Sequence, residues 1–133
     1  MGDDVVSLQR LSVQPNSCPI DDPLDLEMDY TITKPLPDAH WQIKFVADQA
    51  NKRKIVVLGE TPVQDYDAGA QSMRFSVSEV SVSHLKQHVL ANVGLLIAVL
   101  YSAGEEIVQI SMVTQVTPSG DGTLLRSIYN PLD

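Results

Sequence analysis

The feature that most constrains this chain is the segment Asp22–Thr33, in which apolar and polar residues alternate almost without interruption. Successive side chains of a β-strand point to opposite faces of a sheet, so a period of two predicts a strand with one buried face. The residues on the predicted buried face are Leu24, Leu26, Met28, Tyr30 and Ile32. We therefore expect a sheet that covers a hydrophobic core with one side.

The exposed face of this predicted strand begins with three acidic residues, Asp25, Glu27 and Asp29. Like charges on one strand face repel one another, and all three residues have a low strand propensity. We therefore expect a basic group close to them, either in the same molecule or in a partner. The intramolecular candidates on neighbouring strands are Lys44, Arg53, Lys54 and Arg126.

Further short strands are expected along the chain, because turn-forming residues separate a series of apolar segments. This spacing is typical of a sandwich or a barrel. The expected strands are Val5–Val13, Pro23–Thr33, His40–Ala47, Lys54–Leu58, Gln71–Val77, Asn92–Tyr101, Glu106–Val116 and Thr123–Ile128. Of these, Asn92–Tyr101 is almost wholly apolar and predicts a central strand buried on both faces. A small open barrel and an α+β fold are the alternatives.

The connecting segments are expected to be loops and turns. They are Asn16–Asp22, Lys34–Ala39, Asp48–Arg53, the irregular Thr61–Gly69, the hairpin turn Ser102–Glu105 and Pro118–Gly122. Lys34–Ala39 is assigned as a turn because it contains Pro35 and Pro37. Val82–Leu90 alone prefers a helix, because apolar residues recur along it at helical spacing.

The composition restricts the class of protein. The chain has 133 residues and is expected to form a single domain over residues 1–133. Its net charge of −8 argues against a nucleic-acid-binding surface, which needs a basic stripe. Cys18 is the only cysteine, so no internal disulfide can form and an intracellular compartment is expected. The most apolar run, Gly94–Tyr101, is too short to cross a bilayer, so no membrane partner is expected.

No residue pattern predicts catalysis or a cofactor. His84 and His88 would share one helix face, but zinc needs a third and fourth ligand, which no cysteine pair or second histidine motif supplies. Cys18 lies among acidic residues, which do not activate a thiol. The chain also lacks the glycine-rich loops that hold phosphates. We therefore expect no enzyme, no metal and no cofactor, and interpret the chain as a protein-binding module.

Two sequence segments resemble the anti-silencing-function histone chaperones. Asn16–Tyr30 is similar to the family's Asn-Pro-x-Pro-Phe and Pro-Phe-x-Phe-Glu-Ile-x-Phe pattern, and Trp41–Val46 is similar to its Trp-Lys-Ile-x-Tyr-Val pattern. Later landmarks follow in the family's order, and they are Ala68-Gly69, Phe75, Val93-Gly94 and Gly104-x-Glu106. The resemblance implies an all-β, immunoglobulin-like β-sandwich with one short helical segment, which binds a dimer of histones three and four.

The resemblance also implies a histone-binding face with several changed residues. The family's central valine corresponds to Leu95, or to Ile97 if the register is shifted by two residues. Its acidic positions correspond to Ile55 and Val89, its arginine to Gln109 and its tyrosine to Val113. The family's last strand, which captures the tail of histone four, is expected to be missing because the sequence stops at Asp133.

A second, acidic face is implied by the same comparison. Asp38 resembles an acidic position that the family uses to bind basic segments of co-chaperones, and Asp25, Glu27 and Asp29 would add charge there. Two functions follow. The first is an acidic escort of the histone dimer, with a nuclear and cytoplasmic location. The second is an adaptor that binds a non-histone protein through an apolar patch formed by Ile55, Leu95 and Val113, with homodimerisation as a variant.

Overall fold

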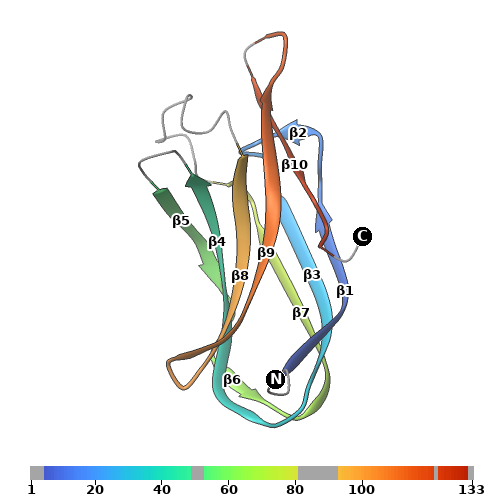
Figure 1. The fold of residues 1–133 in the computed structure, drawn as a ribbon, viewed down its shortest axis with the longest axis vertical. Coiled ribbons are helices and arrows are strands. Elements are labelled where there is room, and N and C mark those ends of the chain that lie inside the picture. The colour runs from blue at the N-terminus through green and yellow to red at the C-terminus, as the bar shows by residue number, and fades with distance from the viewer. Residues whose placement is uncertain (1–4, 49–52, 81–92, 122, 132–133) are drawn as a thin grey trace.

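The computed structural model describes residues 5–48, 53–80, 93–121 and 123–131, and every regular element among them is a β-strand. The strands pack as a sandwich of two antiparallel sheets (Figure 1). Their bounds are β1 Val6–Gln14, β2 Cys18–Pro19, β3 Leu24–Ile32, β4 Leu36–Asp48, β5 Arg53–Glu60, β6 Gln64–Tyr66, β7 Gly69–Val77, β8 Val93–Ser102, β9 Glu105–Pro118 and β10 Leu124–Ile128. The expected immunoglobulin-like sandwich is confirmed.

The two sheets differ in size. The smaller sheet has the order β1-β3-β7, so the alternating strand β3 is its centre. The larger sheet has the order β2-β10-β9-β8-β4-β5, and β6 pairs with the start of β4. Strand β8, which runs between β4 and β9, is the central apolar strand that the sequence predicts. Figure 1 shows the smaller sheet lying against the larger one, with β5 at the free edge of the larger sheet.

The core lies between the sheets and is built from the inward-facing residues of both. In β3 the alternation of apolar and polar residues is matched by their burial. Each of the five apolar residues is at most 3% exposed, while the acidic residues between them are not buried. Opposite them, the inward residues of β4 and β8 include Trp41, Ile43, Leu96 and Leu100, all at most 1% exposed. Burial of these side chains supplies most of the driving force for folding.

One hydrogen bond crosses the core between the two sheets. The indole nitrogen Nε1 of Trp41 on β4 donates to the hydroxyl of Tyr30 on β3 at 3.1 Å, and the two rings meet edge to face with centroids 5.4 Å apart. Both polar atoms are therefore partnered in a place where an unpaired group would be costly. Burial is the main reason that the pKa of the Tyr30 hydroxyl is raised from 10.0 to about 12.

This raised pKa predicts a loss of stability at alkaline pH. Above pH 10 the unfolded chain releases the Tyr30 proton while the folded protein keeps it, so the contribution is complete below pH 10 and is lost as the pH rises towards 12. The expected loss is about 2–3 kcal/mol of unfolding free energy. Denaturant unfolding at a series of alkaline pH values measures it. Tyr30→Phe is the control: it should flatten this part of the profile and cost about 1–2 kcal/mol at neutral pH, and equal profiles for both proteins would contradict the assignment.

Three connecting segments differ from the prediction. Lys34–Ala39 was expected to be a turn, but β4 already begins at Leu36 and pairs with the short strand β6, which lies in the segment Thr61–Gly69 that was expected to be irregular. Asn16–Asp22 was expected to be a loop, but it contains the two-residue strand β2. Strand β4 tolerates Pro37 because its pairing with β6 is interrupted between Leu36 and Ala39, and Pro35 lies before the strand begins.

Of the remaining predictions for the connections, one is confirmed and two fall on residues outside the described ranges. The hairpin turn between β8 and β9 is formed by Ala103 and Gly104, which have φ values of 50° and 83°. Two successive positive φ values give the turn whose twist fits a tight hairpin. The predicted helix Val82–Leu90 lies outside the described residues, as do the central residues of the predicted turn Asp48–Arg53.

Arg126 on β10 is buried and binds the backbone of the segment that precedes β3. Only 2% of the residue is exposed. Its Nη1 donates to the carbonyl oxygens of Ile20 and Asp22, both at 2.9 Å, and its Nη2 donates to those of Pro23 at 2.7 Å and Pro15 at 3.4 Å. Burial lowers the pKa of the Arg126 guanidinium from its ordinary value. This cation therefore ties the Pro15–Pro23 segment to the larger sheet.

Gly94 is the inward-facing glycine of β8, opposite Ala47 on β4 and Thr114 on β9. A Cβ atom at this position would lie 2.8 Å from the carbonyl oxygen of Val46 and 2.9 Å from Cζ of Phe45. Real Cβ atoms do not approach other heavy atoms so closely, so the close packing of β4 on β8 requires glycine here.

Candidate protein-binding face

The outward face of the larger sheet carries a second apolar cluster, separate from the core between the sheets. Its buried members are Val46 on β4 and Ile97 and Val99 on β8, and Leu95 and Tyr101 pack against them. Alternation explains the cluster, because β8 is apolar at every position from Leu95 to Tyr101 and therefore places apolar side chains on both of its faces.

One row of apolar residues crosses four strands of this face. Val46 pairs with Ile55 on β5 and with Leu95 on β8, and Leu95 pairs with Val113 on β9. The two ends of the row are open to solvent, since Ile55 is 54% exposed and Val113 is 47% exposed. We call Ile55, Val46, Leu95 and Val113 the apolar row. Three of the residues expected on a histone-type face, Ile55, Leu95 and Val113, thus meet in one row.

The neighbouring rows change from apolar to polar along the strands. The next row consists of Val57, Lys44, Ile97 and Ser111. Val57 is 53% exposed, which widens the apolar surface at the β5 edge. Ile97, the alternative position for the family's valine, is 5% exposed and lies beneath this surface. Gln109 is on the same face but pairs with Val99, two rows from Leu95, and its amide nitrogen Nε2 donates to Oγ of Ser111 at 3.4 Å.

Polar side chains border this face at the end where the β8–β9 hairpin lies. The His40 ring stacks on the Tyr101 ring with centroids 5.3 Å apart and planes inclined by 19°. Nε2 of His40 lies 3.2 Å from Oε1 of Glu60, which follows the two exposed apolar residues of β5. Among the described residues, the apolar row is thus bounded on this side by charged and hydrogen-bonding side chains.

Two residues of this surface escaped the sequence analysis, and one predicted residue cannot be placed. Val46 and Val57 were not singled out, because each is unremarkable without knowledge of the pairing between β4, β5 and β8. Strand alternation around Trp41 already placed Val46 opposite the core, which was the available signal. Val89 lies outside the described residues.

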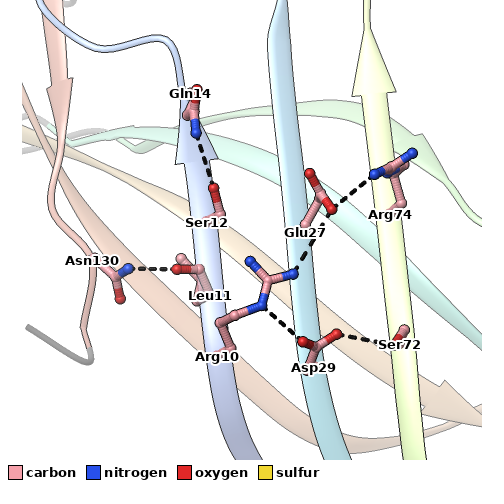
Figure 2. Close-up of polar contacts among 9 residues, drawn as sticks. All are labelled: Arg10, Leu11, Ser12, Gln14, Glu27, Asp29, Ser72, Arg74 and Asn130. Carbon is pink, nitrogen blue, oxygen red and sulfur yellow. Dashed lines mark hydrogen bonds and ion pairs between the residues drawn. The ribbon is translucent and has the colours of Figure 1, made fainter.

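The predicted acidic face is the outward face of the smaller sheet, and its charges are paired within the molecule (Figure 2). Nε of Arg10 donates to Oδ2 of Asp29 at 2.8 Å, and Nη2 of Arg74 donates to Oε1 of Glu27 at 3.0 Å. Arg10 also reaches Oε1 of Glu27 at 3.8 Å. The hydrogen bond from Arg10 is the main reason that the pKa of the Asp29 carboxyl is lowered.

Serine hydroxyls complete the pairing of this face. Oγ of Ser72 donates to Oδ1 of Asp29 at 2.9 Å, and Oγ of Ser76 donates to Oδ1 of Asp25 at 2.6 Å. The arginine and serine partners come from β1 and β7, the two strands that flank β3. Cross-strand pairing across a sheet thus relieves the repulsion that the sequence analysis recognised.

The basic residues that the sequence analysis named as intramolecular partners were the wrong ones. Lys44 belongs to β4 and lies on the outward face of the other sheet, and Arg126 is buried against backbone carbonyls. Arg53 and Lys54 belong to β5, also in the larger sheet. The prediction failed because it did not identify β1 and β7 as the strands that flank β3.

Asp38 is not part of the acidic face of the smaller sheet. It belongs to β4, where its backbone NH donates to Oδ1 of Asp65 at 3.0 Å and its carbonyl oxygen accepts from the backbone NH of Ala103. Its φ of 47° is in the left-handed region, which aspartate tolerates better than most residues. Asp38 therefore lies at the end of the sandwich formed by β6 and the β8–β9 hairpin (Figure 1).

Among the described residues, no three or more histidine, cysteine, aspartate or glutamate side chains form a cluster that could hold a metal ion. His84 and His88 lie outside those residues. In the same part of the chain, no helix has the length and apolar character needed to span a membrane. Cys18 is half-buried, and burial raises the pKa of its thiol.

The sequence was compared with known proteins and protein families. It matches the family described as ASF1 like histone chaperone over residues 3–123. No curated protein matches it. The family consists of non-catalytic, histone-binding β-sandwich proteins, which agrees with the two-sheet sandwich described above. Because the match covers most of the sequence, this protein belongs to the ASF1-like histone chaperone family.

Proposed function

We propose that this protein escorts the dimer of histones three and four without catalysis, and that the dimer docks on the apolar row. The observation that carries the proposal is the meeting of Ile55, Leu95 and Val113 with Val46 in one row across four strands. Half-exposed aliphatic side chains gathered in one place favour a protein partner, since a monomer gains nothing from leaving them in water.

The composition of the row favours a partner that presents apolar side chains at its centre. Ile55 stands where the resemblance implies an acid, so a basic side chain brought there would find no ion-pair partner. An unpaired buried base costs about 1–3 kcal/mol or more, whereas an aliphatic side chain packed on Leu95 gains about 1.5–3 kcal/mol when fully buried. Within the proposal, the histone dimer is therefore held mainly by apolar contacts, with a smaller electrostatic share than an acidic face would give.

Leu95→Arg tests the proposal, because Leu95 is the central member of the row. A guanidinium there places a charge in the middle of the apolar contact, and we expect affinity for the histone dimer to fall at least about thirtyfold. The measurement is a titration of labelled histone dimer with purified protein at about 0.15 M salt, repeated at roughly 0.5 M salt.

The matched control is Gln9→Arg, which adds the same charge on the outward face of the smaller sheet, where Gln9 contacts Thr31. This variant should bind within about twofold of the unmodified protein. Thermal unfolding of both variants checks that they are folded. If the unmodified protein does not bind the dimer, or if Leu95→Arg and Gln9→Arg bind equally well, the proposal is wrong.

A second candidate is supported by the aliphatic character of the same face. Ile55, Val57 and Val113 are about half exposed, and Lys44 is the one charged side chain within the two rows they belong to. An adaptor for a non-histone protein, or a homodimer, would use such a face directly. Binding of that kind should be almost independent of salt. A light-scattering mass of the protein alone separates the homodimer from the monomer.

We further propose that the acidic residues take a secondary, basic ligand of the co-chaperone type. An open depression on the smaller sheet is lined by Ser12, Gln14, Asp25, Glu27, Arg74 and Ser76. A basic segment entering it would compete with Arg74 for Glu27, so binding there is expected to be weak and strongly salt-dependent. Asp38, near the start of β4 in the larger sheet, offers a separate acidic position. As a histone escort, the protein would work in both the nucleus and the cytoplasm.

A further inference from the structure

We propose that Tyr129, which follows β10, is a partner-contacting residue and adds a fifth position to the apolar row. This inference rests on the proposed function, because it assigns one more contact to the same face. Tyr129 lies beyond residues 3–123, over which the family matches, and no sequence pattern singled it out. It is also 52% exposed, so about half of its surface is open to a partner.

The backbone brings Tyr129 into line with the row. β10 pairs with β9 in a register that places Ile128 opposite Thr114. One residue further, the backbone NH of Tyr129 donates to the carbonyl oxygen of Val113 at 2.9 Å. Since Val113 is the last member of the apolar row, Tyr129 continues the row past the edge of β9.

The side chain of Tyr129 lies on the outward face of the larger sheet. Ile128 is 7% exposed and belongs to the core, so strand alternation turns the next residue outward. The Tyr129 hydroxyl donates to Oε1 of Gln115 at 2.7 Å, and Gln115 follows Val113 on the outward face of β9. The hydrogen bond at its far end therefore holds the ring toward Gln115, on the same outward face as Val113.

The residues on either side of Tyr129 are fixed as well. The backbone NH of Ile128 donates to Oδ1 of Asn16 at 2.8 Å. Nδ2 of Asn130 donates to the carbonyl oxygen of Leu11 on β1 at 2.6 Å, which joins the chain to the smaller sheet (Figure 2). An exposed ring on a fixed backbone, with its hydroxyl already bonded, loses little conformational entropy when a partner covers it.

This arrangement specifies the kind of contact. A tyrosine ring contributes a large flat surface with few rotatable bonds, and tyrosine is enriched among the residues that dominate binding energy. Beside Val113, the ring fits an aliphatic side chain of the histone dimer or the stem and charge of a long basic one, which its π face attracts. Tyr129 would then anchor the contact at its β10 end, while Leu95 lies at its centre.

Tyr129→Ala is expected to weaken binding of the histone dimer about tenfold, whereas Tyr129→Phe keeps the ring and should stay within about threefold. The control is Leu125→Ala, which trims an apolar residue of β10 that pairs with Thr117, four residues from Val113 along β9. Leu125→Ala should bind like the unmodified protein. Because the Tyr129 side chain is half exposed, its truncation should leave the melting temperature nearly unchanged.

Chemical footprinting gives a direct readout of contact. Of the four tyrosines in the chain, Tyr30 and Tyr66 are buried and Tyr101 is partly buried. Tetranitromethane should therefore nitrate Tyr129 first, and bound histone dimer should protect it, as measured by mass spectrometry of the Tyr129 peptide.

The outcomes separate this inference from the proposed function. Protection together with the tenfold loss in Tyr129→Ala supports the inference. Dimer binding that depends on Leu95 but leaves Tyr129 open to nitration and insensitive to truncation overturns the inference and keeps the proposed function. Absence of dimer binding in the unmodified protein overturns both.

Discussion

Replacing Arg126 with methionine is expected to lower the free energy of unfolding by about 3–5 kcal/mol, because the buried or partly buried carbonyl oxygens it binds would lose their donor. Two of them, those of Ile20 and Asp22, share Nη1 of Arg126 at 2.9 Å, and that of Pro23 accepts from Nη2 at 2.7 Å. A methionine fills similar space but donates nothing. The loss should appear as a lower midpoint in urea or guanidinium unfolding at neutral pH.

Two further variants show whether the hydrogen bonds or the charge alone matter. Arg126→Lys keeps the charge but cannot reproduce the planar set of donors, so it should recover only part of the lost stability. Arg74→Met removes an arginine whose side chain is 75% exposed, and it should cost less than about 1 kcal/mol. A cost below about 1 kcal/mol for Arg126→Met as well would show that the Pro15–Pro23 segment does not depend on this side chain.

Replacing Gly94 with alanine is expected to destabilise the fold by about 3 kcal/mol, at the upper end of the usual cost of overpacking. The new Cβ would lie 2.8 Å from the carbonyl oxygen of Val46, and a backbone atom in a paired strand cannot move away as a side chain can. Strands β4 and β8 would have to separate, and Leu95, the next residue, would shift with them. Histone binding should therefore weaken together with stability.

Gly120→Ala is the control for that substitution. A Cβ at Gly120 meets nothing within 4 Å, and the backbone there is not in the left-handed region, so unfolding should change by less than about 0.5 kcal/mol. Both variants are compared by denaturant unfolding and by titration with the histone dimer. If Gly94→Ala is as stable as Gly120→Ala, the contact between β4 and β8 is looser than the distances indicate.

Those features of the fold that depend on local pattern could be predicted from the sequence. The alternation in β3 and the apolar run of β8 each identify a strand, its buried face and its place in a sheet, because side-chain periodicity follows directly from strand geometry. The short strands β2 and β6 could not be predicted in this way. They form because β10 and β4 offer unpaired backbone groups to segments that are distant in the sequence.

The candidate site, too, could be predicted only in part from the sequence. The resemblance placed Ile55, Leu95 and Val113 on one face, and strand pairing brings them into one row. Tyr129 could not be found from the sequence, since its position beside Val113 depends on the register of β10 against β9. The arginine partners of the acidic residues were missed for the same reason: Arg10 and Arg74 are adjacent to Glu27 only through the pairing of β1 and β7 with β3.

The contrast between the two outward faces has a practical consequence for measurements on a solid support. The outward face of the smaller sheet is covered by side chains that bond to one another, and Gln9 lies on it, hydrogen-bonded to Ser7 and Thr31. A protein tethered to a sensor chip through a cysteine at position 9, with Cys18 replaced by serine, would turn its apolar row toward the flowing solution. Random attachment through lysines would include Lys44, which lies in the neighbouring row opposite Val57, and would hide part of the surface under study.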